Sequence, residues 1–177
     1  MTAANVRAEA LRIAGTQADK KVRETSRNSG PEVDAYLRSV GLGPGYAWCA
    51  AFVHWCFDQG SAALALDNPC PRTAGTLHLW DMCPAEWRMK PMINPDTTDG
   101  EIEAMIAAAT PAPGDVFVID HGHGLGHVGF IEGRKDDGSW WTVEGNTNPG
   151  GSREGDGVYR RTRRRDEVNR GYLRIGG

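Results

Sequence analysis

Apolar residues in the first third of the chain recur at the spacing of amphipathic helices. They stand among charged residues over about 3–14, and after Pro31 they follow the i, i+3, i+4, i+7 pattern. These positions are Val6, Ala10, Leu11 and Ile13 in the first stretch and Val33, Tyr36, Leu37 and Val40 in the second. The pattern predicts two helices, with a polar loop over 17–30 between them and a turn at Gly41.

From residue 111 onward the apolar pattern becomes that of strands. Short apolar runs are bounded by turn residues, and Asp136-Asp137-Gly138 is a hairpin signal between two of them. The predicted strands are 116–119, 127–131, 140–144 and a final pair around 158–161 and 172–175. The sequence thus predicts a small antiparallel sheet that follows the helices.

The intervening residues 61–110 are interrupted by prolines and predict an irregular connection. Two short helices are expected within it, near 73–80 and 101–109. No internal repeat or linker divides the chain. Helices first and strands later predict one α+β domain over residues 1–177.

Composition narrows the class of protein. The chain has 40% hydrophobic and 24% charged residues, as expected of a soluble globular domain. Its net charge of −3 argues against nucleic acid as the main partner. No apolar run approaches the ~20 residues of a membrane span, and no signal-peptide pattern opens the sequence, so we expect synthesis in the cytoplasm and no membrane insertion.

The stretch around Cys49 is the candidate reactive site. A turn rich in glycine and proline over 41–45 delivers the chain to a predicted helix that starts near Cys49. Unpartnered N–H groups and the helix dipole at such a start favour a thiolate over a thiol. The other cysteines, Cys56, Cys70 and Cys83, form no zinc spacing with Cys49 and are expected to be reduced.

The predicted hairpin supplies a partner for this thiol. A turn near Asp136 and Asp137 places His127 opposite residues 144 to 146, and the strand period puts Glu144 and Asn146 on one face. A catalytic histidine needs such an acceptor to fix its orientation. We therefore expect Cys49, His127 and either Glu144 or Asn146 to form a catalytic set.

Simpler interpretations compete with this hypothesis. An isolated cysteine in an apolar helix is more often a core residue than a nucleophile. His54 is a second candidate base, but it lies about 140° round the predicted helix from Cys49. His121 and His123, with His127, could bind a transition metal, although a glycine-rich loop would hold such ligands loosely.

Four motifs carry a family resemblance. They are Tyr46-Ala47-Trp48-Cys49-Ala50-Ala51-Phe52-Val53-His54-Trp55, Pro113-Gly114-Asp115-Val116-Phe117, Gly126-His127-Val128-Gly129-Phe130 and Val143-Glu144-Gly145-Asn146-Thr147-Asn148. In this order, over about residues 28–148, they resemble the CHAP branch of the papain-like peptidoglycan amidohydrolases, within the wider NlpC/P60 group. The resemblance implies a papain-like fold in which Cys49 is the nucleophile at a helix N-terminus. It also implies that His127 is base and then acid, with Glu144 and Asn146 orienting it.

The chain departs from relatives at some positions. Ala47 stands where many relatives have proline, and Gly43 stands where a papain-like enzyme has the oxyanion glutamine. The backbone N–H of Cys49 is the expected oxyanion donor, with Tyr46 as the second choice. Because residues 41–48 contain no acid, a calcium loop is not expected, and we predict no required metal or cofactor.

Aromatic and basic residues supply candidate substrate contacts. Tyr46, Trp48 and Trp141 are candidates, and Trp48, Trp140 and Trp141 could stack on sugar or peptide, although core packing is at least as good an interpretation. A basic run could attract anionic wall polymers or stem-peptide carboxylates, but a solvated strand face is the favoured interpretation. Its members are Arg160, Arg161, Arg163, Arg164 and Arg165.

The resemblance implies a cysteine hydrolase of peptidoglycan amides, either a muramoyl-alanine amidase or a stem or cross-bridge endopeptidase. Such an enzyme would be wall-lytic or a delivered antibacterial effector, reaching the wall or periplasm after lysis or by specialised secretion. A secretion carrier or a cognate immunity protein would then be its partner. The alternatives are a papain-like peptidase or isopeptidase on protein, a non-catalytic peptidoglycan-binding module, or a metalloprotein.

Overall fold

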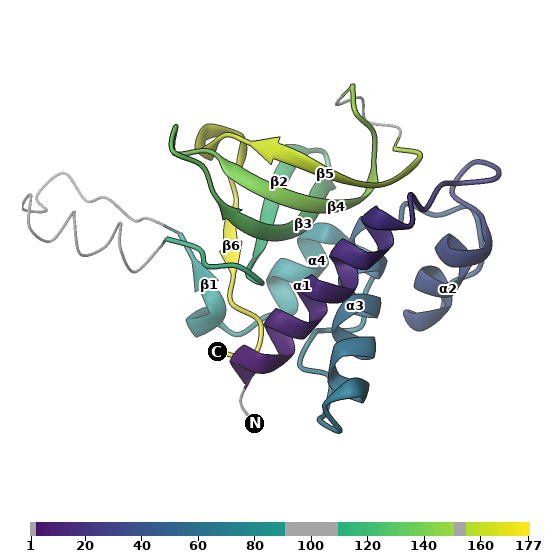
Figure 1. The fold of residues 1–177 in the computed structure, drawn as a ribbon, viewed down its shortest axis with the longest axis horizontal. Helices are drawn as coiled ribbons and strands as arrows, with labels where there is room; N and C mark the ends of the chain where they lie inside the picture. Colours follow the sequence, from purple (N-terminus) through teal and green to yellow (C-terminus); the bar gives the residue numbers. More distant parts are fainter. Residues whose placement is uncertain (1–2, 91–109, 151–154) are drawn as a thin grey trace, which may run out of the picture.

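Helices cover one face of a curved antiparallel sheet in the computed structural model, which describes residues 3–90, 110–150 and 155–177 (Figure 1). The helices are α1 (Ala3–Asp19), α2 (Pro31–Ser39), α3 (Cys49–Ala63) and α4 (Thr76–Met82), with short 3-10 turns η1 (Ala85–Trp87) and η2 (Arg165–Glu167). The strands are β1 (Arg88–Met89), β2 (Val116–Gly122), β3 (Leu125–Arg134), β4 (Trp140–Thr147), β5 (Gly157–Arg163) and β6 (Gly171–Leu173). The predicted α+β, papain-like fold class is confirmed.

The sheet has the strand order β1-β6-β2-β3-β4-β5, and each neighbouring pair is antiparallel. The three central predicted strands and the hairpin at residues 136–138 are therefore confirmed. The final two predicted strands exist but do not pair with each other. β5 lies at the edge beside β4, whereas β6 inserts between β1 and β2, so the chain crosses the sheet between them.

Two helix boundaries differ from the prediction. α1 continues to Asp19 instead of ending near residue 14, because its last turn is held by a buried hydrogen bond from Tyr36 Oη to Gln17 Oε1 of 2.9 Å. α4 begins at Thr76 rather than near residue 73, since Thr73 Oγ1 accepts the Gly75 N–H and forms a turn before the helix. The helix predicted at 101–109 lies outside the described residues.

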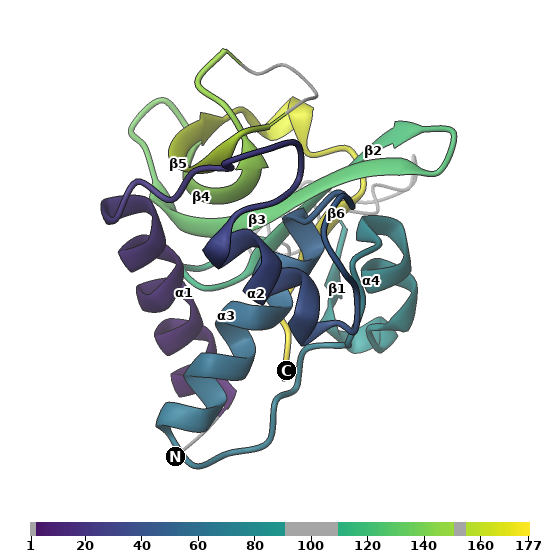
Figure 2. The same ribbon diagram turned by 90° about the vertical axis from the view of Figure 1, so that its right-hand side faces the viewer.

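The main core lies between the sheet and α3, which runs beneath β3 and β4 (Figures 1 and 2). Phe52 of α3 is fully buried and meets Trp48 and Phe130 edge-on, with ring centroids 6.3 and 6.4 Å apart. Burial of one such ring contributes about 1.5–3 kcal/mol. This packing fixes the start of α3 against the middle of the sheet. Within the described residues, no helix is long and apolar enough to cross a membrane.

Candidate active site

Cys49 is the first residue of α3, as the sequence predicts, and its side chain is almost fully buried. Its Sγ lies 3.3 Å from Oγ1 of Thr76, the first residue of α4. Gly145 of β4 permits the close approach of α3, because a Cβ at this position would lie 2.7 Å from atoms of Phe52 and Trp48. The glycine that follows Glu144 therefore brings the helix start and the strand together.

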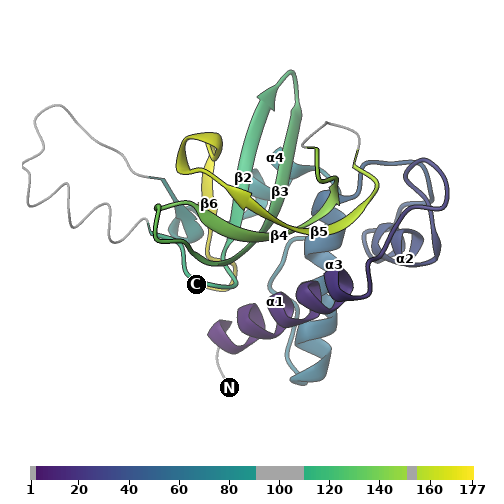
Figure 3. The same ribbon diagram turned by 45° about the horizontal axis from the view of Figure 1, so that its top comes forward.

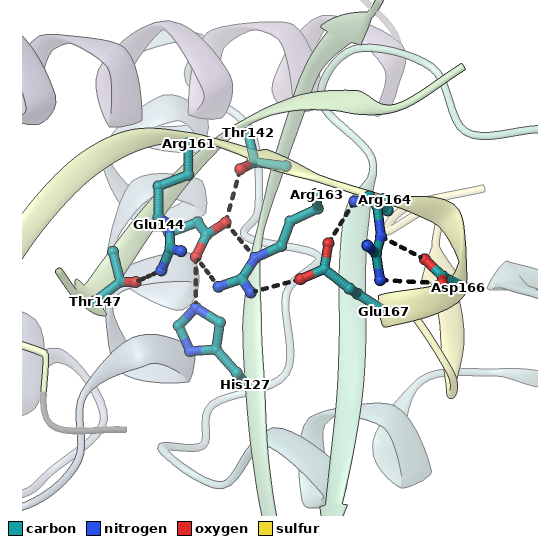
Figure 4. Close-up of polar contacts among 9 residues, drawn as sticks. All are labelled: His127, Thr142, Glu144, Thr147, Arg161, Arg163, Arg164, Asp166 and Glu167. Carbon is teal, nitrogen blue, oxygen red and sulfur yellow. Dashed lines mark hydrogen bonds and ion pairs between the residues drawn. The ribbon is translucent and has the colours of Figure 1, made fainter. Parts of the chain in front are cut away.

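The predicted contact across the β3–β4 hairpin is present. His127 Nε2 lies 2.9 Å from Glu144 Oε2, in a register that pairs Phe130 with Val143 (Figure 4). Of the two expected acceptors, Glu144 thus meets the imidazole ring. Asn146 lies in an irregularity of the β4–β5 pairing, has a left-handed backbone with φ of 56°, and lines the cleft beside Cys49 and His127.

Glu144 is completely buried and bonded on both oxygens. Arg163 forms a bidentate pair with the Glu144 carboxylate, in which Nε donates to Oε1 at 2.9 Å and Nη2 donates to Oε2 at 2.7 Å (Figure 4). Thr142 Oγ1 also donates to Oε1, at 2.7 Å. Burial opposes ionisation of this carboxyl, but the bonds and charges of His127 and Arg163 outweigh burial and hold its pKa below the ordinary value. Glu144 is therefore an ionised, fixed anchor for the ring.

With Nε2 of His127 bonded to Glu144, the other ring nitrogen is left for the thiol of Cys49, which lines the same cleft. Burial raises the pKa of Cys49, but the bond and charge of His127, the Thr76 hydroxyl and the Ala50 N–H together lower it below the ordinary value. Burial likewise opposes the charge on His127, while Cys49 and Glu144 raise its pKa to about 9. The pair therefore favours a thiolate beside an imidazolium.

The other cysteines have the opposite electrostatics. Burial raises the pKa of Cys56 and Cys70 well above the ordinary value and raises that of Cys83 to about 11. They are free thiols in the core. All three are buried, so they pack in the core and are not surface thiols.

The other candidate histidines, His54, His121 and His123, lie outside strand β3, which carries His127. His54 Nδ1 lies 3.2 Å from the Cys70 carbonyl and 3.1 Å from that of Pro71, so this ring anchors the segment after α3. His121 and His123 lie at the tip of the β2–β3 hairpin, which projects beyond the helices (Figures 2 and 3), and they line the cleft of Cys49. In the described parts of the chain, no three His, Cys, Asp or Glu side chains are grouped so that they could hold a metal ion.

A cleft of about 520 Å³ opens over Cys49 and His127. Its lining includes the imidazoles of the hairpin tip and two arginines of β5, Arg161 and Arg163. Tyr46 is exposed and precedes Ala47, which lines the cleft. A separate hollow of about 590 Å³, next to Trp140, shares none of these residues.

Two of the candidate substrate contacts, Trp48 and Trp141, do not line this cleft. Trp48 is fully buried, and its Nε1 donates to Glu24 Oε1 at 2.7 Å, so its indole belongs to the core. Trp141 is exposed but stands three residues before Glu144 on β4, where strand alternation turns it to the opposite face. Its ring lies under Lys135 Nζ, 4.7 Å from the ring centroid.

Two residues of the site were missed from sequence. Arg163 was assigned with its neighbours to a solvated face, yet its side chain is only 13% exposed because it is folded onto Glu144. Alternation along β5, once paired with β4, is the signal that puts Arg161 and Arg163 on one face. No local signal marks Thr76, since its place beside Cys49 depends on how α4 packs.

An α+β domain with a cysteine at a helix start, facing a histidine and a carboxylate on adjacent antiparallel strands, has the arrangement of a papain-like cysteine hydrolase. Residues 41–146 match the sequence profile described as the CHAP domain. This range covers more than half of the chain, which therefore belongs to the CHAP family, whose members are generally cysteine-dependent amidases or peptidases of peptidoglycan. No curated protein and no solved structure shows a significant match.

Proposed function

We propose that this protein is a cysteine hydrolase that cleaves an amide bond of bacterial peptidoglycan. The bond is either the muramoyl–alanine amide or one within the stem or cross-bridge peptide. The observation that carries the proposal is the Cys49–His127–Glu144 arrangement at the floor of an open cleft in a CHAP domain.

The first half of the reaction forms a thioester. The Cys49 thiolate attacks the amide carbonyl carbon, and His127 then gives its proton to the leaving nitrogen as the C–N bond breaks. Glu144 keeps the imidazolium oriented and compensates its charge without taking a proton, because Arg163 and Thr142 also stabilise the carboxylate.

The oxyanion of this step requires N–H donors. The first N–H groups of α3 have no intrahelical partner and carry partial positive charge, so the backbone N–H of Cys49 is the proposed donor. Tyr46, exposed just before Ala47, is the second proposed donor.

The second half regenerates the enzyme. Neutral His127 takes a proton from water, the resulting hydroxide attacks the thioester carbonyl, and the C–S bond breaks. The product leaves as a carboxylic acid, which loses its proton to solvent, and Cys49 is again a thiolate beside a protonated ring. The balance is one water consumed per amide cleaved, with no metal or redox cofactor in the proposal.

The route to the wall is a further part of the proposal. The protein acts at the wall or in the periplasm after lysis or through specialised secretion, as a wall-lytic enzyme or an antibacterial effector. In the secreted case, a carrier and a cognate immunity protein are its partners.

Purified sacculi test the proposal. Wild type and Cys49→Ala are compared with Cys56→Ala, a control two turns along the same helix. We expect soluble fragments from wild type and the control but none from Cys49→Ala, and mass spectrometry of the fragments identifies the bond. Fragment release by Cys49→Ala would reject the nucleophile assignment.

A further inference from the structure

Arg161 stands in the wall of the cleft, on the strand next to Glu144. Its Nη1 donates to the buried Thr147 Oγ1 at 2.8 Å, which holds the guanidinium at the cleft (Figure 4). Strand alternation places it on the same face as Arg163, two residues further along β5. Both arginines lie outside the range matched by the CHAP profile.

The charge of Arg161 differs from that of its neighbours. Within the described residues it makes no ion pair, and its bond to Thr147 is to a neutral hydroxyl. Three other arginines of the run are compensated: Arg160 by Asp19 and Glu132, Arg163 by Glu144 and Glu167, and Arg164 by Asp166. Arg165 lines the separate hollow next to Trp140 and not the cleft of Cys49. Arg161 therefore has donors and a charge available for a ligand.

One positive charge, that of Arg161, has no compensating charge among the described residues. Arg163 is matched by Glu144 and Glu167, and the imidazolium of His127 faces the Cys49 thiolate in the cleft. Among the described residues that line it are two arginines and three histidines but no aspartate or glutamate. Glu144 lies behind His127, completely buried, and its charge is already matched by Arg163. A concave site of one sign raises the local concentration of ligands of the other sign.

We infer that Arg161 binds a carboxylate of the substrate close to the amide that Cys49 attacks. The inference rests on the proposed function and narrows its substrate to stem-peptide segments with a free carboxylate rather than a carboxamide. Arginine suits this role because its planar fork bonds both carboxylate oxygens. A cleft of about 520 Å³ has the size of a small-ligand site, so the carboxylate and the amide belong to the same or adjacent residues.

Paired synthetic stem peptides, identical except for carboxylate or carboxamide, test this directly. We expect wild type to prefer the carboxylate by about 10- to 100-fold in kcat/KM, the range of a hydrogen bond to a charged group. Arg161→Gln should bring the ratio close to one, with Arg161→Lys intermediate. Arg164→Gln, an exposed change in the same run, should keep the wild-type ratio.

A wild-type ratio near one, or an unchanged ratio in Arg161→Gln, overturns the inference and leaves the hydrolase intact. Failure of wild type to cleave either peptide or sacculi overturns the proposed function and this inference with it.

Carboxylate recognition by Arg161 can also be tested without a peptidoglycan substrate, by comparing two thiol reagents. Iodoacetate carries a carboxylate and iodoacetamide does not, and we expect both to alkylate Cys49. The rate ratio of the anionic to the neutral reagent at Cys49 should fall severalfold in Arg161→Gln and stay unchanged in Arg164→Gln. Equal ratios in wild type and Arg161→Gln would show that Arg161 does not recognise a carboxylate there.

Discussion

Cys49 and Cys56 lie two turns apart on the same helix, and both are buried, yet their thiols have opposite electrostatics. Burial, together with the nearby Cys70, raises the pKa of Cys56, whereas Cys49 has His127, Thr76 and the Ala50 N–H beside it and its pKa is lowered. Burial therefore does not decide whether a cysteine is inert. The polar groups that other segments bring to the thiol decide it.

Removal of His127 should have the largest effect on the pKa difference between Cys49 and Cys56. In His127→Ala, Cys49 loses the cation and hydrogen bond that offset its burial, so its pKa should rise towards those of the core thiols. The expected loss of hydrolysis is about 10²–10⁴-fold, the contribution of a positioned acid and base. His54→Ala is the control, because that ring bonds the Cys70 carbonyl instead. Equal losses in both variants would contradict the assignment of the base.

Glu144→Gln should weaken both the site and the fold. The change leaves Arg163 with only Glu167 and removes the anion from a completely buried position, which costs about 3–5 kcal/mol when a buried pair is broken. The free energy of unfolding in urea measures this. Glu132→Gln breaks a partly exposed pair, between Glu132 of β3 and Arg160 of β5, and should cost less than about 1 kcal/mol. A similar cost for both variants would show that the buried network is not tightly coupled.

Thr76→Val should act on the thiol without removing the base. The side chain keeps its shape but no longer bonds Sγ, so the pKa of Cys49 should rise and kcat/KM should fall by about tenfold, the effect of one hydrogen bond to a charged group. Thr76→Ser keeps the hydroxyl and should stay near wild type. The pH dependence of Cys49 alkylation measures the change, and an unshifted profile in Thr76→Val would exclude this role.

A change of pH should alter the rate of thioester formation less than the substitutions do, but it reports on Cys49 and His127 specifically. Formation of the thioester needs a thiolate and an imidazolium together, so its rate should fall at low pH as Cys49 takes a proton. It should also fall above about pH 9, where His127 loses its proton. Single-turnover measurements from pH 5 to about 10 bracket both limbs. A rate that keeps rising above pH 9 would mean that His127 does not act as the acid.

The stability of the folded protein is linked to the same ring. Because the pKa of His127 is raised from 6.5 to about 9, its stabilising contribution is complete below pH 6.5 and is lost as pH rises towards 9. Glu144 has a lowered pKa, so its contribution is present above about pH 4.5 and is lost at lower pH.

The parts of the site that are local in sequence could be predicted. The turn before Cys49 and the hairpin between His127 and Glu144 follow from residue types and strand period, so the sequence predicts both the helix start and the cross-strand contact. Arg163 and Thr76 could not be found in this way. Their positions depend on the pairing of β5 with β4 and on the packing of α4 against the start of α3, which no short motif encodes.

The position of Trp48 could not be predicted for a similar reason. A tryptophan next to a candidate nucleophile fits a substrate groove as well as a core, and only the buried contact with Glu24 Oε1 decides between them. For the arginine run, the sequence shows five cations but not which of them already have a carboxylate partner.

The most direct test of the central claim is the rate at which each cysteine is alkylated near neutral pH, followed by mass spectrometry of the native protein. We expect Cys49 to react faster than Cys56, Cys70 and Cys83, since its pKa is lowered and theirs are raised. Labelling of Cys49 at a rate equal to or slower than that of the other three would contradict the nucleophile assignment.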